Sequence, residues 1–197
     1  MGPSLERNEM RDVRIYVISG FRQGKQRWNG SINISERLRD EYNGALTNVT
    51  YLTWDTNWPA LAEFMFLIQD DHMQSRRKPP VNIVCDYSYG GGWGARRLMK
   101  FCRRRGVAIE HAILSDPVHR GPLGWIGRWP IWIPDNVRKV TLLRQKEDYP
   151  RGCDIRLQNK ETTCIVRKRL LKVGHSWMDD HPRYLEEICS AANKVLV

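Results

Sequence analysis

The chain has 197 residues, of which 41% are hydrophobic and 27% are charged. This length suits one domain with a substantial core, and the balance of apolar and charged residues excludes an intrinsically disordered chain and a membrane protein. No stretch approaches the roughly 20 apolar residues of a membrane-spanning helix, and the first residues carry no apolar signal segment. We therefore expect a single domain over residues 1–197, with a flexible tail at 1–11, located in the cytoplasm.

The chain contains five cysteines, which is an odd number, and no two of them are separated by only two residues. This spacing favours neither a disulfide framework nor a zinc site. Histidines do not stand at ligand spacing from the cysteines, so we expect reduced thiols and no bound metal.

Positive charge exceeds negative charge by ten, which would attract anionic partners to the surface. The basic residues cluster at 76–78, at 96–105 and at 167–169. Because these clusters fall in separate predicted elements, we favour solvated surfaces as their interpretation. Nucleic-acid binding, which would weaken steeply with added salt, is the less favoured alternative.

Short apolar runs alternate with helix-length segments along the chain. Strands are predicted at 13–19, 49–54, 81–87, 108–115, 137–145 and 163–172, and helices at 35–46, 58–73, 94–106 and 180–196. Ser35 suits the N-cap position of the first helix. Strands interleaved with helices predict a three-layer α/β/α domain with a mostly parallel sheet, in which sites form at the carboxyl ends of the strands.

The segment between residues 120 and 134 is the one long connection between predicted elements, and it contains Trp125, Trp129 and Trp132 among Ile, Gly and Pro. It is too broken for a helix and too apolar for an ordinary surface loop. Two interpretations stay open: the connection packs on the core, or it walls an apolar substrate pocket.

The most informative motif is the strand 81–87 followed by Ser88, Tyr89 and a run of glycines that opens the next helix. A serine forced onto a tight strand-to-helix turn projects its hydroxyl above the sheet, and small residues after it let the helix approach the strand. Ser88 therefore has the setting of a nucleophile elbow.

With this elbow the chain resembles the α/β-hydrolase superfamily, over nearly its whole length. The resemblance implies a compact α/β-hydrolase with sheet order second, first, third, fourth, fifth and last strand, and a Ser-acid-His triad. Ser88 matches the nucleophile, Asp116 stands at the end of the next strand as the acid, and His175 follows the last strand as the histidine. It also implies an oxyanion hole made by the backbone N–H of Tyr89 with that of Phe21 or Arg22.

Several competing residues remain at these positions. Glu147 and Asp148 follow the fifth strand, where much of the superfamily places its acid, although we favour Asp116. His119 and His181 are alternatives to His175, although His181 is better placed to cap the last helix. Asp179 and Asp180 are also expected to cap or charge the N-terminus of that helix.

The first elbow position also differs, because the superfamily usually has glycine where this chain has Asp86. That carboxyl group must find partners or solvent, or act on His175 or on a substrate group.

The function implied is hydrolysis of a carboxylic ester or thioester through an acyl-enzyme on Ser88, with an apolar acyl group and no cofactor. The loop with Gly20, Gly24 and Lys25 agrees with the expectation that no cofactor is needed, since its spacing is not that of a nucleotide-binding P-loop. An inactive binding module with the same fold is the alternative from another class.

Overall fold

The structure is a computed structural model that describes residues 11–21, 23, 29–43, 47–119, 129–170 and 172–196. The predicted N-terminal tail lies outside these residues except for Arg11. The strands are β1 (Val13–Ile18), β2 (Thr47–Leu52), β3 (Val81–Tyr87), β4 (Ile109–Ser115), β5 (Ile131–Ile133), β6 (Val137–Arg144), β7 (Ile155–Leu157) and β8 (Cys164–Arg169). The helices are α1 (Gly30–Glu41), α2 (Trp58–Gln74), α3 (Arg96–Arg104) and α4 (Pro182–Leu196), with short helical segments η1 (Gly90–Ala95) and η2 (His175–Trp177).

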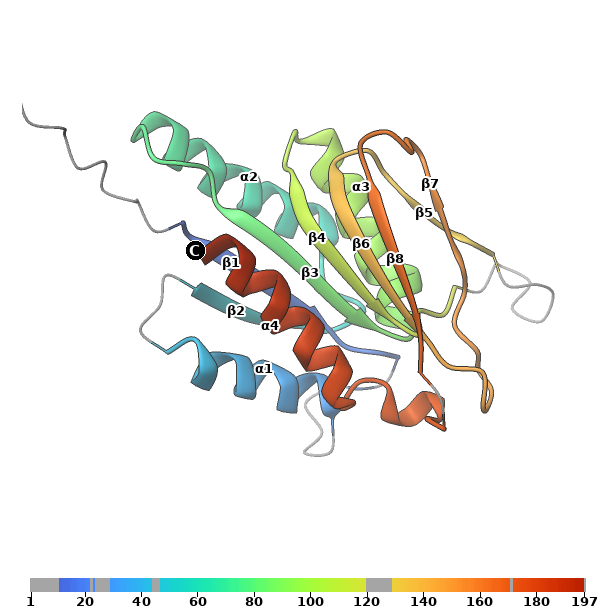
Figure 1. The fold of residues 1–197 in the computed structure, drawn as a ribbon. Helices are drawn as coiled ribbons and strands as arrows, with labels where there is room; N and C mark the ends of the chain where they lie inside the picture. The colour runs from blue at the N-terminus through green and yellow to red at the C-terminus, as the bar shows by residue number, and fades with distance from the viewer. Residues whose placement is uncertain are drawn as a thin grey trace, which may run out of the picture.

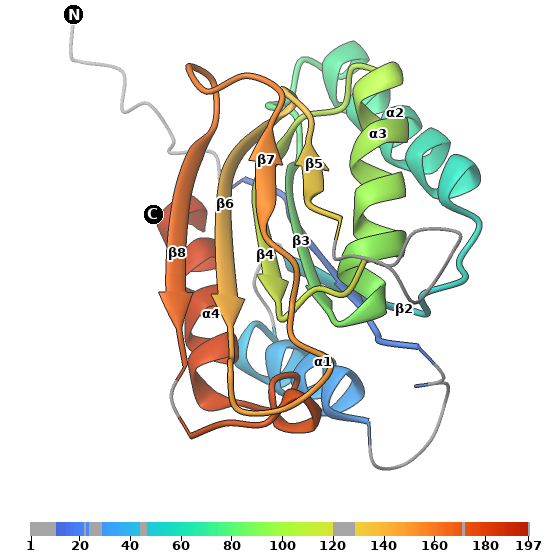
Figure 2. The same cartoon turned by 90° about the vertical axis from the view of Figure 1, so that its right-hand side faces the viewer.

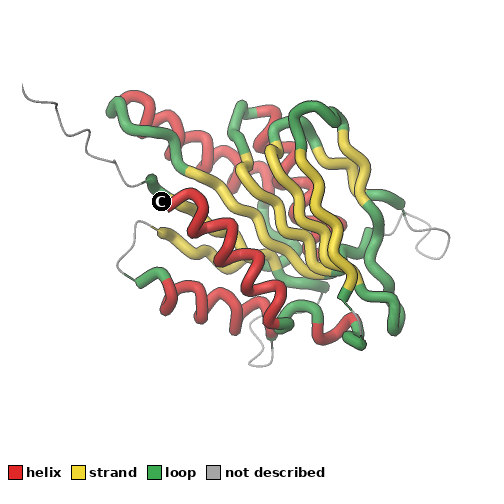
Figure 3. Tube along the Cα trace, in the orientation of Figure 1, coloured by secondary structure: helices red, strands yellow, loops and turns green. Residues whose placement is uncertain are grey.

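Six of the strands form one parallel sheet in the order β2-β1-β3-β4-β6-β8. Helices α1 and α4 lie on one face of this sheet, and α2 and α3 lie on the other (Figure 1). The tube in Figure 3 shows the strands as one continuous layer between the helices. The predicted three-layer architecture and the predicted strand order are both confirmed.

A second, two-stranded parallel sheet of β5 and β7 was not predicted. It lies on the side of α3 (Figure 2) and places Ile131, Ile133 and Ile155 in the same buried cluster as the α2 and α3 side chains. Each strand is three residues long, too short for an alternating pattern to stand out in the sequence. The pair covers part of the sheet where α3 does not reach.

The first helix begins earlier than the sequence pattern indicated. Asn29 is its N-cap, accepting hydrogen bonds from the backbone N–H groups of Ser31 and Ile32, so the prediction that Ser35 caps this helix is wrong. Ser35 is buried within α1 and its hydroxyl donates to the carbonyl of Ser31 at 2.7 Å. A serine can satisfy its hydroxyl in this way inside a helix, which is why its presence does not fix a boundary.

The two central strands end together at the carboxyl edge of the sheet. Tyr87 at the end of β3 is paired with Ser115 at the end of β4, so the next residues, Ser88 and Asp116, leave the sheet side by side. Both have positive φ angles, 53° and 43°. None of the described helices is long and apolar enough to span a bilayer.

Candidate active site

Ser88 occupies a sharp turn between β3 and the helical segment η1. Its backbone N–H donates to the carbonyl of Ser115 at 3.0 Å, and its own carbonyl accepts from Val118 N–H at 2.7 Å. The same carbonyl accepts from the N–H groups of Gly91 and Gly92 at 3.2 and 3.3 Å. These bonds hold Ser88 in the left-handed region, which is unfavourable for a serine and is typical of functional turns.

The glycines after Ser88 bring η1 close to the neighbouring loops. A Cβ atom at position 92 would overlap the carbonyl oxygen of Val118, and one at position 91 would overlap Oδ1 of Asp86 and stand 2.7 Å from Cβ of Pro117. The glycine run is therefore required by close approach of the backbone rather than by a bound phosphate.

His175 joins Ser88 to Asp116. Its Nε2 lies 2.8 Å from Oγ of Ser88, and its Nδ1 lies 2.6 Å from Oδ2 of Asp116. An ionised carboxylate can only accept hydrogen bonds, so Nδ1 carries the proton and Nε2 is left as an acceptor for the serine hydroxyl. The structure thus brings together the three residues that the sequence order selected.

The Asp116 carboxylate is fully buried and is held in place by three further donors. Gln145 donates to Oδ2 through its side-chain Nε2 at 2.9 Å, Gly152 donates its backbone N–H to Oδ1 at 2.9 Å, and Gln145 N–H donates to Oδ1 at 3.4 Å. A buried carboxylate is tolerated only with such partners. Neither Gln145 nor Gly152 was selected from the sequence, because each belongs to an unremarkable loop.

The competing acids do not reach the imidazole. Oδ1 of Asp148 accepts instead from the backbone N–H of His175 at 2.6 Å, and Oε1 of Glu147 accepts from the backbone N–H of Lys172 at 3.4 Å. The carboxylate on the ring is that of Asp116, and Asp148 holds the main chain of the same histidine.

Tyr87, the last residue of β3, fixes the other side of His175. Its hydroxyl donates to the His175 carbonyl at 2.9 Å, and the two ring centroids are 5.1 Å apart. Burial raises the pKa of Tyr87, so the hydroxyl stays protonated as a donor. Its place next to Ser88 was the only sequence signal for this role.

The competing histidines also lie apart from this arrangement. Nδ1 of His181 accepts from the backbone N–H of Arg183 at the start of α4, in agreement with its predicted capping role. His119 is buried, and its backbone N–H bonds the sulfur of Cys153 at 3.2 Å. Burial lowers the pKa of the His119 imidazole.

Asp86 finds neither a partner nor solvent. Its side chain is fully buried, and within the described part of the chain neither carboxyl oxygen has a hydrogen-bond partner. Burial raises its pKa well above the usual range, which favours the neutral acid. Burial thus disfavours the charge that would act on His175 or on a substrate group, and within the described residues no hydrogen bond joins Asp86 to His175.

The loop after β1 is tied to the loop that follows His175. Gln23 accepts the backbone N–H of Gly20 at 2.9 Å with Oε1 and donates to Oδ2 of Asp179 at 2.7 Å with Nε2. Asp179 is buried at this contact, and its role with Asp180 in capping or charging the start of α4 stays a prediction. Phe21, one predicted oxyanion donor, lies in this loop, whereas Arg22, the other, lies outside the described residues.

An aromatic cluster, which the sequence analysis missed, begins at Tyr89, directly after Ser88. Ring centroids of Phe21 and Trp54 lie 5.6 and 5.4 Å from that of Tyr89, and Trp93 stacks on Tyr89 at 6.0 Å. The Arg97 guanidinium lies over the Trp93 ring, with its Cζ 3.7 Å from the ring centroid. These rings come from three separate segments, so no local pattern could reveal them. They form a partly exposed apolar surface beside the serine.

The tryptophans of the long connection have another setting. Trp125 lies outside the described residues, and Trp129 and Trp132 are 54% and 52% exposed. The described ring contact of Trp132 is with the Arg156 guanidinium across the β5–β7 pair, at 5.9 Å. Their role in substrate binding stays a prediction.

Cys85 is fully buried in β3, with a free thiol whose pKa burial raises well above its ordinary value. Within the described residues, no group of three His, Cys, Asp or Glu side chains is arranged to hold a metal ion.

No protein-family model matches the chain, and no curated protein matches it. Solved structures do match. RedJ, a thioesterase from the prodiginine biosynthetic pathway in Streptomyces coelicolor, is 14% identical with a TM-score of 0.50, over 92% of this chain and 86% of that one. ClbQ from the colibactin NRPS/PKS pathway is 9% identical with a TM-score of 0.50, over 93% of this chain and 98% of that one. The fold is the α/β-hydrolase fold, as the sequence predicted.

Proposed function

We propose that this chain, with its α/β-hydrolase fold, is a serine hydrolase that cleaves a carboxylic ester or thioester through an acyl-enzyme on Ser88. The observation that carries the proposal is the continuous hydrogen-bonded relay from Ser88 Oγ through the His175 ring to Asp116. A hydroxyl has little nucleophilicity unless a base takes its proton, and His175 Nε2 is positioned for that transfer.

In the first half of the reaction, Ser88 Oγ attacks the substrate carbonyl carbon while His175 accepts the serine proton. Asp116 stabilises the imidazolium that forms and keeps the proton of Nδ1 in place. His175 then gives its proton to the leaving alcohol or thiol, and the carbonyl is restored as an ester of Ser88. Water repeats the sequence to release the acid and the free serine.

The negative charge that develops on the carbonyl oxygen needs donors fixed before the reaction. The backbone N–H of Tyr89 stands at the positive end of the helical segment that begins with η1, and the N–H of Phe21 would be the second donor. The bridge made by Gln23 between Gly20 and Asp179 supports this assignment, because it would hold the Phe21 loop against the rest of the site.

An apolar or aromatic acyl group is the substrate feature that the site supports. Phe21, Trp54 and Tyr89 give it a partly exposed aromatic surface next to the serine. Aromatic side chains offer large apolar area, and pockets for small molecules are lined mainly by such groups. We include thioesters because RedJ is a thioesterase.

A fluorophosphonate probe, which reacts with activated serines, tests the proposal directly. The wild-type chain should be labelled and should hydrolyse p-nitrophenyl esters, and both properties should be lost in Ser88→Ala and in His175→Ala. Ser75→Ala, at the exposed end of α2, is the matched control and should behave as wild type. A folded wild-type chain that is neither labelled nor active would instead indicate a binding module.

A further inference from the structure

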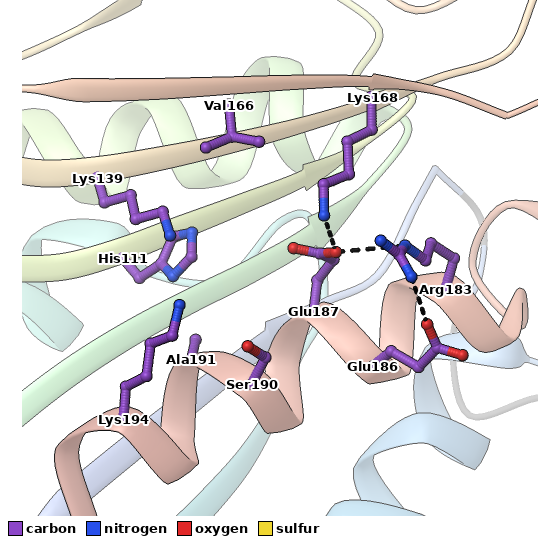
Figure 4. A pocket seen from close by; sticks show the side chains of 10 residues that line it. All are labelled: His111, Lys139, Val166, Lys168, Arg183, Glu186, Glu187, Ser190, Ala191 and Lys194. Atoms are coloured by element: carbon purple, nitrogen blue, oxygen red, sulfur yellow. Dashed lines mark hydrogen bonds and ion pairs between the residues drawn. The ribbon is translucent and has the colours of Figure 1, made fainter.

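A recess of about 440 Å³ lies on the α4 face of the sheet, away from Ser88. It is bounded by the strands β4, β6 and β8 on one side and by α4 on the other (Figure 4). Its volume falls within the range of about 300–1,000 Å³ found for small-molecule pockets. The recess lies where α4, which packs over β1, β3 and β4, leaves β6 and β8 at the sheet edge less covered (Figure 1).

The lining of this recess has an excess of two positive charges. Four cationic side chains face two carboxylates: Lys139, Lys168, Lys194 and Arg183 against Glu186 and Glu187. Lys168 pairs with Glu187, and Arg183 pairs with Glu186 at 2.9 Å and with Glu187 at 3.4 Å. The ionic pairing is therefore confined to one end of the recess.

Lys139 and Lys194 are the two cations left over. Within the described part of the chain neither forms an ion pair, and their ammonium groups lie near the His111 ring in Figure 4. Two ammonium groups in one recess repel each other, and this arrangement is relieved when an anion binds between them. The unpaired charges thus mark the end of the recess that would accept a ligand.

His111 provides a buried polar group at the same end. Its side chain is 6% exposed, and its Nε2 is bonded to Oγ1 of Thr141 at 2.8 Å, a residue that is itself fully buried. Nδ1 has no hydrogen bond within the described residues. Burial, helped by the charges of Lys139, Lys194 and Lys168, lowers the pKa of His111 to about 3, so the ring is neutral.

We propose that this recess is a binding site for a compact phosphate or pyrophosphate group, carried as a free anion or on a small organic molecule, with Lys139 and Lys194 as its charged ligands and His111 as a hydrogen-bonding partner. Two unpaired ammonium groups match a doubly charged anion. Lysine is a common partner of phosphate, which it binds as a point charge. An extended polyanion fits less well, because Glu186 and Glu187 stand at the other end.

The site is distinct from the proposed catalytic residues. His111 stands four residues before Ser115 on β4, which places its backbone roughly 13 Å from the carboxyl edge of the sheet. The binding proposal therefore holds or fails independently of ester hydrolysis. It would also give a role to part of the excess positive charge that the active site does not use.

Calorimetric titration of the whole chain with sodium pyrophosphate, at low ionic strength and pH 7.5, tests the proposal. We expect saturable binding of one anion, weakened roughly tenfold in Lys139→Gln and in Lys194→Gln. Lys100→Gln, an exposed lysine on α3 across the sheet, is the control and should bind as wild type. Parallel titrations with inorganic phosphate and with a nucleoside diphosphate distinguish a free anion from an organic phosphate, and tighter binding of either supports the site.

Nuclear magnetic resonance of the His111 ring gives a second, local measurement. Pyrophosphate should shift the His111 resonances and raise the pKa of the ring, because an anion offsets the lysine charges. Absence of binding at about 1 mM pyrophosphate, equal binding by wild type and both lysine variants, or binding confined to an RNA oligonucleotide would each overturn the proposal.

Discussion

The carboxyl group of Asp86 fills the space that a side chain at position 91 would need. A Cβ at Gly91 would overlap Oδ1 of Asp86, so the acid before Ser88 and the glycine after it form one packing unit. This explains how the elbow accommodates Asp86 in place of the glycine that the superfamily usually has there.

Gly91→Ala should lower the free energy of unfolding by roughly 1–3 kcal/mol, because the added methyl group overpacks this unit. The double variant Asp86→Gly/Gly91→Ala should recover part of that loss, because the Asp86 carboxyl group is gone. Recovery should be incomplete, because the new Cβ at position 91 would still stand 2.7 Å from Cβ of Pro117. Urea denaturation of both single variants and the double variant measures the coupling. Strictly additive losses would show that the two positions do not share the space.

Asp86→Asn should stabilise the protein at pH 7. Burial raises the folded-state pKa of Asp86 above its unfolded value, so folding takes up a proton at pH values between the two. The contribution of Asp86 to stability is full below the unfolded pKa of about 4 and is lost as the pH rises toward the folded pKa. The melting temperatures of the wild type and of Asp86→Asn should therefore be equal near pH 4 and differ increasingly as the pH rises. A constant difference in melting temperature from pH 4 to 8 would contradict a buried neutral acid.

Asp116→Asn should reduce kcat by about 10³–10⁴-fold, because the amide no longer fixes the tautomer or the charge of His175. Asp148→Asn should cost roughly tenfold, because it weakens only the hold on the His175 backbone N–H. Glu147→Gln, one residue away and bonded to Lys172, is the control and should keep full activity. Steady-state hydrolysis of a p-nitrophenyl ester ranks the three, and the reverse order for Asp116 and Asp148 would reassign the triad acid.

Gln23→Ala should lower kcat more than it raises KM, since it releases the loop that carries Phe21 while leaving Ser88 and His175 in place. We expect kcat to fall roughly tenfold. Fluorophosphonate labelling should become slower but remain complete. Gln74→Ala, an exposed glutamine at the end of α2, should change neither quantity.

Trp54→Ala should reduce kcat/KM for p-nitrophenyl benzoate several-fold while leaving p-nitrophenyl acetate nearly unchanged. The expected loss corresponds to about 0.5–1.5 kcal/mol of aromatic contact. Phe64→Ala, an exposed aromatic residue on α2, is the matched control. Equal losses on both esters would show that Trp54 supports the fold rather than the acyl group.

The alternating buried strands predicted the six-stranded sheet, and the resemblance to the α/β-hydrolase superfamily selected Ser88, Asp116 and His175 by their order in the chain. Both signals missed contacts between side chains distant in the sequence. Tyr87, Gln145 and Asp148 hold the histidine and its acid through hydrogen bonds that follow no spacing rule. The aromatic cluster likewise assembles from three segments, so the tryptophans grouped in the sequence drew attention to the long connection instead.

Because Tyr87 pairs with Ser115, the meeting of Ser88, His175 and Asp116 depends on the alignment of β3 with β4. Side chains alternate between the faces of a sheet, so a slip of β4 by one residue would turn every β4 side chain to the opposite face. Asp116 would then leave the imidazole even if all three residues were unchanged. Substitutions deep in β3 or β4, remote from the serine, can therefore separate the three proposed catalytic residues by misaligning the strands.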